Sequence, residues 1–175
     1  SNTNTVTMDG YKTVTVKFEE IPSVKNVIVN PGFEDGKSPW KFYTNGEGSF
    51  EISSSVYEGA GAARITTTTI GTNIQFFQHD LPLEPNTEYD LSFAAYSNTG
   101  HDLRVTLCQH GPPYNNYGLA KQIVNLTTSW DTYSINFTTK NFSSPVNDSR
   151  LSFWLATDSK DGDQYWIDEV VLQAR

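Results

Sequence analysis

The chain has 175 residues, of which 18% are charged and 37% hydrophobic, so it is long and apolar enough to bury the core of one domain of ordinary size. Its net charge of -8, with no basic stripe, excludes a nucleic-acid binder and offers nothing to hold an anionic membrane surface. No apolar run approaches the roughly 18 residues of a membrane span, and the lone Cys108 rules out an intrachain disulfide and a thiolate zinc cage.

The first 22 residues differ in pattern from the rest of the chain. TVTMDGYKTVTVKFEEIP (5–22) is typical of two short strands around an Asp9-Gly10 turn, closed by Pro22. It resembles the last hairpin of the B-repeat found in long bacterial surface proteins. We therefore expect residues 1–22 to be a linker or the tail of a preceding surface-repeat module, and residues 23–175 to be the main domain. The alternative is an extra strand on that domain.

Alternation of apolar and polar residues with period two recurs along the chain and predicts many short strands. The segments that show it are 13–18, 26–30, 49–53, 62–68, 73–78, 89–96, 102–109, 121–126, 131–139, 150–156 and 165–173. Turn-forming Gly, Pro, Asn and Asp separate them, and Asp161 and Asp163 are interpreted as solvated turn residues. The pattern predicts an all-β fold, a jelly-roll β-sandwich of two antiparallel sheets.

Five motifs follow one another from residue 26 onward. They are NVIVNPGFEDGKSPW (26–40), VYEGAGAARI (56–65), FFQHDLPLEPNTEYDLSFAAYSN (76–98), TTSWDTYSINFTT (127–139) and YWIDEVVL (165–172). In this order they resemble the carbohydrate-binding modules of families 4, 9, 16 and 22, with family 16 as good a match as any. Those modules are jelly-roll β-sandwiches appended to polysaccharide-degrading enzymes.

The resemblance implies a non-catalytic carbohydrate-binding module on residues 23–175. Such a module binds plant-type polysaccharide chains, here β-1,4-glucan or mannan, in a groove on one sheet and targets an attached glycoside hydrolase to its substrate. We therefore expect a polysaccharide or oligosaccharide partner, a larger multimodular enzyme or surface protein around the module, and an extracellular, secreted or cell-surface location. The four Asn-x-Ser/Thr sequons agree weakly with that location; they begin at Asn125, Asn136, Asn141 and Asn147.

The resemblance also implies a structural calcium ion that joins the loop after the first predicted strand to the last strand. Carried over by position, Glu34 and Asp168 would supply carboxylates and Gly32 a backbone carbonyl, with further oxygens from Glu58 or the region of Ala60. Calcium takes about six to eight hard oxygens, and loops rich in Gly and Pro can turn their carbonyls inward. The alternative is that the two acids are ordinary solvated side chains.

The best candidate for contact with a sugar is Trp154. In RLSFWLA (150–156) Leu151, Phe153 and Leu155 share one face and are expected in the core, so Trp154 points outward. A tryptophan in mid-strand is costly to leave in water, whereas a flat ring suits the apolar C–H face of a pyranose.

The same parity argument, applied to the neighbouring predicted strands, extends the candidate groove. If these strands share a sheet, one groove would be lined by Trp154, Tyr96, Phe77, Gln75, Arg104 and His110. The loop QHGPPYNNYG (109–118) would add Gln109 and Tyr114 at one end. Trp40, after a loop, is either buried or a further stacking platform.

Catalysis is not expected. Hydrolysis of a glycosidic bond needs two carboxylates that flank the scissile bond, and the outward strand positions hold no such pair. Two other readings stay open. One is a structural or adhesive domain of a cell-surface protein without a sugar groove. The other is an alginate- or glucan-cleaving jelly roll in which Arg104, His110 or a Tyr acts as acid and base.

Overall fold

The computed structural model describes Gly10 and residues 25–175. The remainder of the predicted 1–22 tail, including the strand expected at 13–18, lies outside the described residues. The strands are β1 (Lys41–Thr44), β2 (Glu47–Ser53), β3 (Ala62–Thr69), β4 (Ile74–Leu83), β5 (Glu88–Ser97), β6 (Leu103–Gln109), β7 (Asn116–Val124), β8 (Asp131–Thr138), β9 (Val146–Trp154) and β10 (Gln164–Ala174).

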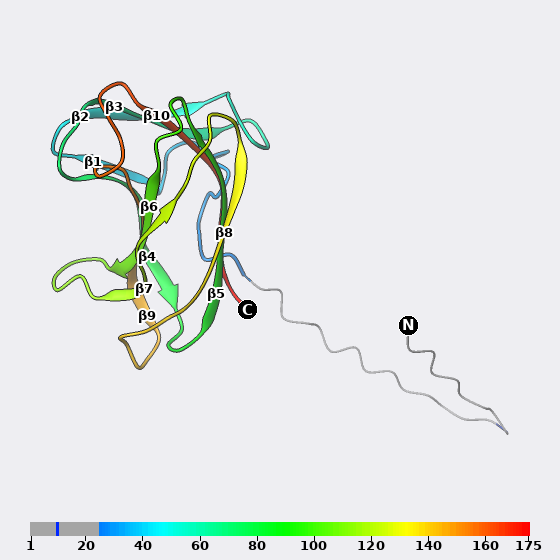
Figure 1. Cartoon of the computed structure of the whole chain (residues 1–175). Helices are drawn as coiled ribbons and strands as arrows, with labels where there is room; N and C mark the ends of the chain where they lie inside the picture. Colours follow the sequence, from blue (N-terminus) through cyan, green and yellow to red (C-terminus); the bar gives the residue numbers. More distant parts are fainter. Residues whose placement is uncertain (1–9, 11–24) are drawn as a thin grey trace.

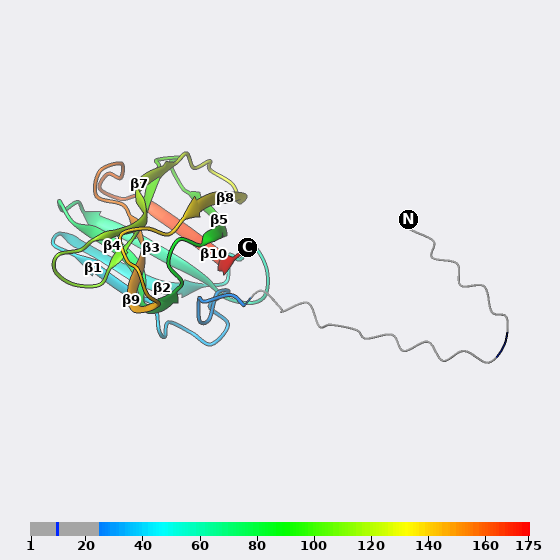
Figure 2. The same cartoon turned by 90° about the horizontal axis from the view of Figure 1, so that it is seen from below.

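The strands form two five-stranded sheets whose pairings are antiparallel throughout the described chain. One sheet has the order β1-β4-β9-β6-β7 and the other β2-β3-β10-β5-β8, and Figures 1 and 2 show them as the two layers of a sandwich. The described part contains no helix, and so none that could cross a membrane. The predicted all-β sandwich of two antiparallel sheets is confirmed.

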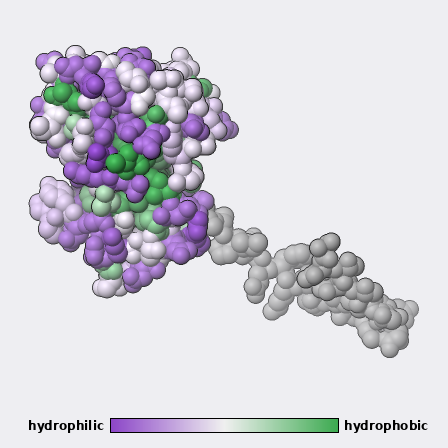
Figure 3. All heavy atoms as spheres, viewed as in Figure 1, coloured by the Kyte–Doolittle hydropathy of each residue, from purple (hydrophilic) through white to green (hydrophobic). Residues whose placement is uncertain are grey.

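The core lies between the two sheets, where the alternating pattern places it. Leu151, Phe153 and Leu155 are fully buried, as predicted. Phe153 meets Phe93 of the other sheet edge to face, with ring centroids 5.0 Å apart. Figure 3 shows hydrophobic residues gathered in the middle of the viewed face, with hydrophilic residues around them.

Some predicted strand boundaries differ from the structure. Residues 26–30 are not a strand: they run beside β10, where the Val27 amide donates to the Leu172 carbonyl at 2.8 Å. The C-terminus therefore lies next to the blue start of the described chain (Figures 1 and 2). Strand β1 was not predicted, and β7 covers 116–124 instead of 121–126, because its alternation is interrupted by a register shift against β6.

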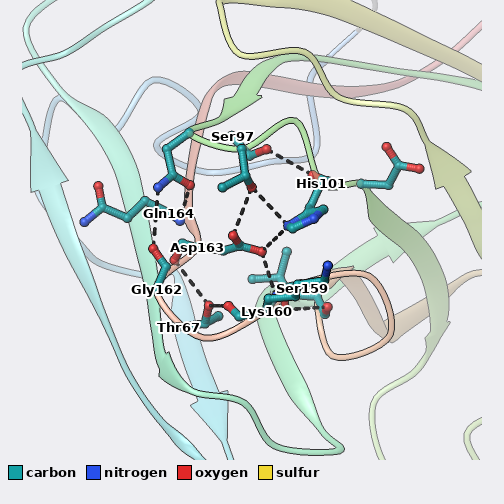
Figure 4. Close-up of polar contacts among 12 residues, drawn as sticks. Thr67, Ser97, His101, Ser159, Lys160, Gly162, Asp163 and Gln164 are labelled. Atoms are coloured by element: carbon teal, nitrogen blue, oxygen red, sulfur yellow. Dashed lines mark hydrogen bonds and ion pairs between the residues drawn. The ribbon is translucent and has the colours of Figure 1, made fainter.

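Asp163 is not the solvated turn residue that its neighbours suggest. It is 2% exposed, and its carboxylate accepts hydrogen bonds from the Thr99 hydroxyl (2.9 Å), the His101 ring (2.7 Å) and the Lys160 amide (2.7 Å) (Figure 4). Burial alone would raise the pKa of Asp163, but these hydrogen bonds outweigh it and the pKa is lowered. The network fastens the turn before β10 to the end of β5.

Candidate functional site

An open groove of about 760 Å³ lies on the outer face of the β1-β4-β9-β6-β7 sheet. Its aromatic lining residues are Tyr43, Phe77, Tyr114 and Trp154. Its polar lining residues are Asn73, Gln75, Thr106, Asn116 and Ser152, and its cationic ones are Lys121 and Arg150. Cys108 and Ala120 complete the wall. No Asp or Glu of the described residues lines the groove.

The register between strands explains why these side chains meet. Trp154 on β9 pairs with Gln75 on β4 and with Arg104 on β6. One step along, Ser152 pairs with Phe77 and Thr106. Side chains opposite one another on paired strands point to the same face, so small Ser and Thr side chains form the floor between the rings of Trp154 and Phe77.

The indole of Trp154 stands partly open on this face. The Lys121 ammonium lies over its ring at 4.5 Å from the centroid. Its Nε1 is buried without a hydrogen-bond partner among the described residues. By contrast, the Gln75 amide is held in place, because its Nε2 donates to Asn73 Oδ1 at 2.6 Å and its Oε1 accepts from the Ser152 hydroxyl at 3.4 Å.

The structure therefore brings four of the sequence-predicted residues together at the groove, namely Trp154, Gln75, Phe77 and Tyr114. Arg104 shares their face but does not line the groove. Its guanidinium turns to the Asp158 carboxylate, with Nε and Nη2 donating at 2.8 and 3.1 Å. That hydrogen-bonded ion pair raises the pKa of Arg104.

His110 and Gln109 lie beyond the groove end. The His110 ring stacks on His79 with centroids 4.2 Å apart. Burial, together with the nearby His79 and Arg150, lowers the pKa of His110. Gln109 donates from Nε2 to the Asp148 carboxylate at 3.1 Å. Neither side chain lines the groove as the sequence suggested.

Two further candidates for the groove lie elsewhere in the structure. Tyr96 faces outward as predicted, but β5 belongs to the other sheet, where Tyr96 stacks on Trp166 with centroids 4.5 Å apart. Parity gives the face of a strand but not the sheet that it joins. Trp40 is 3% exposed and stacks on Phe76 at 4.8 Å, and its Nε1 donates to the Asn30 carbonyl; it is a core residue and not a platform.

Sequence reasoning missed several lining residues. Ser152 and Arg150 precede Trp154 by two and by four residues, so the alternation could have identified both. Tyr43 lies on a strand of four residues, too short for a clear alternating pattern. Lys121 has a positive φ of 52° where β7 is irregular, and the simple period therefore could not place it.

The five residues expected around calcium also lie in one region. The Glu34 carboxylate accepts from the amides of Ala60 (2.8 Å) and Gly61 (3.1 Å). Asp168, fully buried, accepts from the amides of Tyr57 (2.9 Å) and Glu58 (3.2 Å). The loops 30–36 and 54–61 are thus tied to each other and to β10.

This region is crowded with negative charge. Burial raises the pKa of Asp168, and the neighbouring Glu34 adds to that rise against the amide hydrogen bonds. Burial likewise raises the pKa of Glu169, with Asp168, Glu58 and Glu34 adding to it. A Cβ on Gly32 would stand 2.5 Å from Glu169 Oε1, so a larger residue there would require the Glu169 carboxylate to shift.

The donor types and the uncompensated charge fit a hard cation. The described residues, however, contain no group of three or more His, Cys, Asp or Glu side chains placed to hold a metal ion, so backbone carbonyls or water would have to complete any site.

Comparisons with known proteins agree with this fold. The model of the family CBM_4_9, Carbohydrate binding domain, matches residues 25–160. No curated protein matches the sequence.

Solved structures with the same fold include carbohydrate-binding modules. One, "CBM4 structure and function", is 22% identical with a TM-score of 0.62, over 82% of this chain and 99% of that one. The N-terminal cellulose-binding domain of β-1,4-glucanase C from Cellulomonas fimi is 21% identical with a TM-score of 0.61, over 82% and 93%. A family 16 carbohydrate-binding module is 20% identical with a TM-score of 0.59, over 84% and 99%.

The resemblance expected from the five motifs is confirmed. Because the family model spans well over half of the sequence, the chain belongs to the carbohydrate binding domain family CBM_4_9.

Proposed function

We propose that this chain is a non-catalytic module that holds a polysaccharide chain in the groove of the β1-β4-β9-β6-β7 sheet. The observation that carries the proposal is the composition of the groove: four aromatic side chains line an open depression together with amides and hydroxyls. Aromatic rings stack on the apolar faces of sugars, and amide groups bind their hydroxyls. Trp154 and Phe77 would carry the stacking, and Gln75, Asn73 and Asn116 the polar contacts.

The backbone we propose for the ligand is a soluble β-1,4-linked glucan or mannan chain. An open groove with separated rings suits single chains better than the flat face of a crystal. The cellulose-binding domain from Cellulomonas fimi supports a β-1,4-glucan as one candidate. Few ligand atoms would be buried, so we expect dissociation constants of about one to some tens of micromolar.

The wider setting follows from the family. We propose an extracellular module, secreted or attached to the cell surface, that belongs to a larger protein and brings a glycoside hydrolase to its substrate. A role as a structural or adhesive domain without a sugar ligand is the alternative, and the exposed lining of the groove argues against it, because Tyr43 and Tyr114 are 50% and 55% exposed.

We also propose that calcium binds between the loops 30–36 and 54–61 and the start of the bulge in β10. Glu34 and Asp168 would be its carboxylate ligands, and the carbonyls near Gly32, Glu58 and Ala60 would add neutral oxygens. The ion would supply positive charge to a region crowded with carboxylates. This chain's own part is to hold the two loops together through the amide hydrogen bonds described above.

Calorimetric titration with cellohexaose and mannohexaose tests the binding proposal. We expect Trp154→Ala to lose about tenfold or more in affinity, since a stacked ring contributes about 1 kcal/mol beyond its buried area. The matched control is Tyr96→Ala, an outward aromatic on the other sheet, which should bind like the unchanged chain. Equal affinity of Trp154→Ala and the unchanged chain would remove the groove from the proposal.

A further inference from the structure

We propose that the ligand of the groove is acidic: a β-1,4-linked chain that carries carboxylates, a polyuronate, in place of a neutral glucan or mannan. This inference rests on the proposed function, because it names the class of sugar that the same groove would bind. The backbone and the stacking stay as proposed above, and the hydroxymethyl group on each ring is replaced by a carboxylate.

The first observation is the sign of the charge in the groove. The whole chain is acidic, with 20 Asp and Glu residues against 12 Lys and Arg. The charged lining residues within the described part are nevertheless Lys121 and Arg150, both positive. A depression lined with one sign of charge attracts ligands of the other sign, the more so when the rest of the surface repels them.

The second observation is that Arg150 has no acidic partner among the described residues. Its guanidinium lies over the rings of Phe77 and Tyr114, 5.4 and 5.7 Å from their centroids. Its one side-chain hydrogen bond there is a long one to the sulfur of Cys108, at 3.7 Å. On the same face Arg104 makes a two-point ion pair with Asp158. The sheet thus neutralises the arginine outside the groove and leaves the one inside it for a ligand.

The third observation is a set of buried donors that lack acceptors. Six side-chain atoms among the described residues are buried without a hydrogen-bond partner, and three belong to groove residues: Arg150 Nε, Trp154 Nε1 and Thr106 Oγ1. The first two can only donate. A buried donor without an acceptor is costly, and carboxylate oxygens are the strongest acceptors that a saccharide can offer.

The fourth observation is the backbone at Lys121. Leu119 of β7 pairs with Leu107 of β6, and Gln122 pairs with Val105. Two residues of β7 therefore lie opposite a single residue of β6, so β7 carries one extra residue. Lys121 lies in that bulge with φ at 52°. A left-handed conformation is unfavourable for lysine, and bulges commonly re-aim a side chain. Here the bulge lays the ammonium group over the ring of Trp154.

The positions of the two cations favour a chain with repeated charges. Lys121 lies over Trp154, and Arg150 lies over Phe77 and Tyr114. A polyuronate presents a carboxylate on every sugar, so separate carboxylates could draw the two cations off the rings that they cover, and its sugar rings could then stack there. A single charged terminus would satisfy only one of them.

Calorimetry with a matched pair of ligands tests the inference. Mannohexaose and the β-1,4-linked hexamer of mannuronic acid share backbone and linkage and differ in the carboxylates alone. At about 20 mM salt we expect the hexauronate to bind at least about tenfold more tightly, and the advantage to shrink at about 500 mM salt because the charges are screened. Equal or weaker binding of the hexauronate at low salt would overturn the inference.

Two variants locate the effect. Arg150→Gln and Lys121→Gln should each cut the low-salt preference for the hexauronate by about fivefold or more. Arg64→Gln, which removes a cation from the outer face of the other sheet, should keep it. Thermal unfolding checks that the variants fold, and the salt dependence of the unchanged chain decides the question if one of them does not.

The outcomes separate the two proposals. Binding of mannohexaose without any preference for the hexauronate would leave the proposed function standing and remove the acidic ligand. Failure of both hexamers and of cellohexaose to bind would remove both. Binding of the hexauronate alone would support the acidic ligand and the groove as the binding site, and would remove neutral mannan as the ligand.

Discussion

Both outer faces of the sandwich carry a row of side chains that contains a tryptophan, a tyrosine and an arginine, but the tryptophans lie in different surroundings. On the groove side, one row across the strands reads Tyr43, Gln75, Trp154 and Arg104. On the opposite sheet the corresponding row reads Glu51, Arg64, Trp166 and Tyr96. Each row has a tryptophan on its central strand.

The two tryptophans differ in which groups cover the ring and in whether Nε1 has a hydrogen-bond acceptor. Trp166 is 9% exposed, its ring is covered by Tyr96, and its Nε1 donates to the Ser53 hydroxyl at 3.3 Å. Trp154 is covered by one lysine, and its Nε1 has no partner within the described residues. A tryptophan whose ring is covered and whose N–H has an acceptor is structural, whereas a partly open tryptophan without an acceptor is available to a ligand.

The substitution Trp166→Ala should give the largest loss of stability. Removing a nearly buried tryptophan typically costs about 3 kcal/mol or more, whereas Trp154→Ala should cost under about 1 kcal/mol because its ring is partly in solvent. Denaturant unfolding measures both free energies. A greater loss of stability for Trp154→Ala than for Trp166→Ala would contradict the contrast between the two faces. Trp166→Ala should also keep the sugar affinity of the unchanged chain.

Calcium removal should also destabilise the chain without closing the groove. If calcium binds as proposed, a hundredfold excess over its dissociation constant stabilises the folded state by about 2.7 kcal/mol. Adding a chelator should therefore lower the melting temperature, and returning Ca²⁺ should restore it. Sugar affinity should change little, because the acidic region ties loops to β10 in the other sheet.

A melting temperature that changes neither with the chelator nor with added Ca²⁺ would contradict the proposed calcium site. Asp161→Asn is a matched control. It removes a carboxylate that lies shortly before β10 and accepts a hydrogen bond from the Ile70 amide, away from these loops.

The loss of folding stability at low pH should depend on Asp163. Its folded pKa lies below the usual value of about 3.9, so its contribution is present above that pH and is lost as the pH falls through the folded pKa. Asp163→Asn should lose about 2 kcal/mol at pH 7, since it weakens several hydrogen bonds to a charged group. Unfolding free energies between pH 7 and pH 2 should then fall less steeply for the variant. Parallel curves for the two proteins would contradict this role.

The smallest change in unfolding free energy is expected at the Arg64–Glu51 ion pair on the outer face of the β2-β3-β10-β5-β8 sheet. Arg64→Gln breaks the contact with Glu51, and both side chains are partly exposed, 37% for Arg64 and 51% for Glu51. Such surface pairs contribute about 0.5 kcal/mol or less, so its unfolding free energy should stay close to that of the unchanged chain. A loss above about 1.5 kcal/mol would mean that the row around Trp166 depends on this pair.

Much of the site could be predicted from local patterns. The alternation in 150–156 predicted the core positions of Leu151, Phe153 and Leu155 and the outward position of Trp154, and the structure agrees. Extending the same alternation back by two and by four residues would also have found Ser152 and Arg150. The five ordered motifs predicted the family, which the comparison confirms.

Other residues could not be placed in this way. Tyr96 has the predicted parity, but its strand pairs with β8 and β10, far away in the sequence. The residues next to Asp163 in the sequence are typical of a solvated turn. Its partners Thr99 and His101 lie about 60 residues earlier in the chain, so the local pattern does not reveal them. Lys121 enters the groove because of a bulge that changes the period of β7.

The sequence by itself thus determined most of the strands, the face that side chains take within a regular strand, and the family, because side-chain alternation is a property of a single strand. The tertiary structure decided which strands became neighbours, where a bulge interrupted the alternation, and which charged groups found partners. Those features depend on pairings between distant segments, and it is they that leave Arg150 without an acidic partner in the described chain while Arg104, on the next strand, has one.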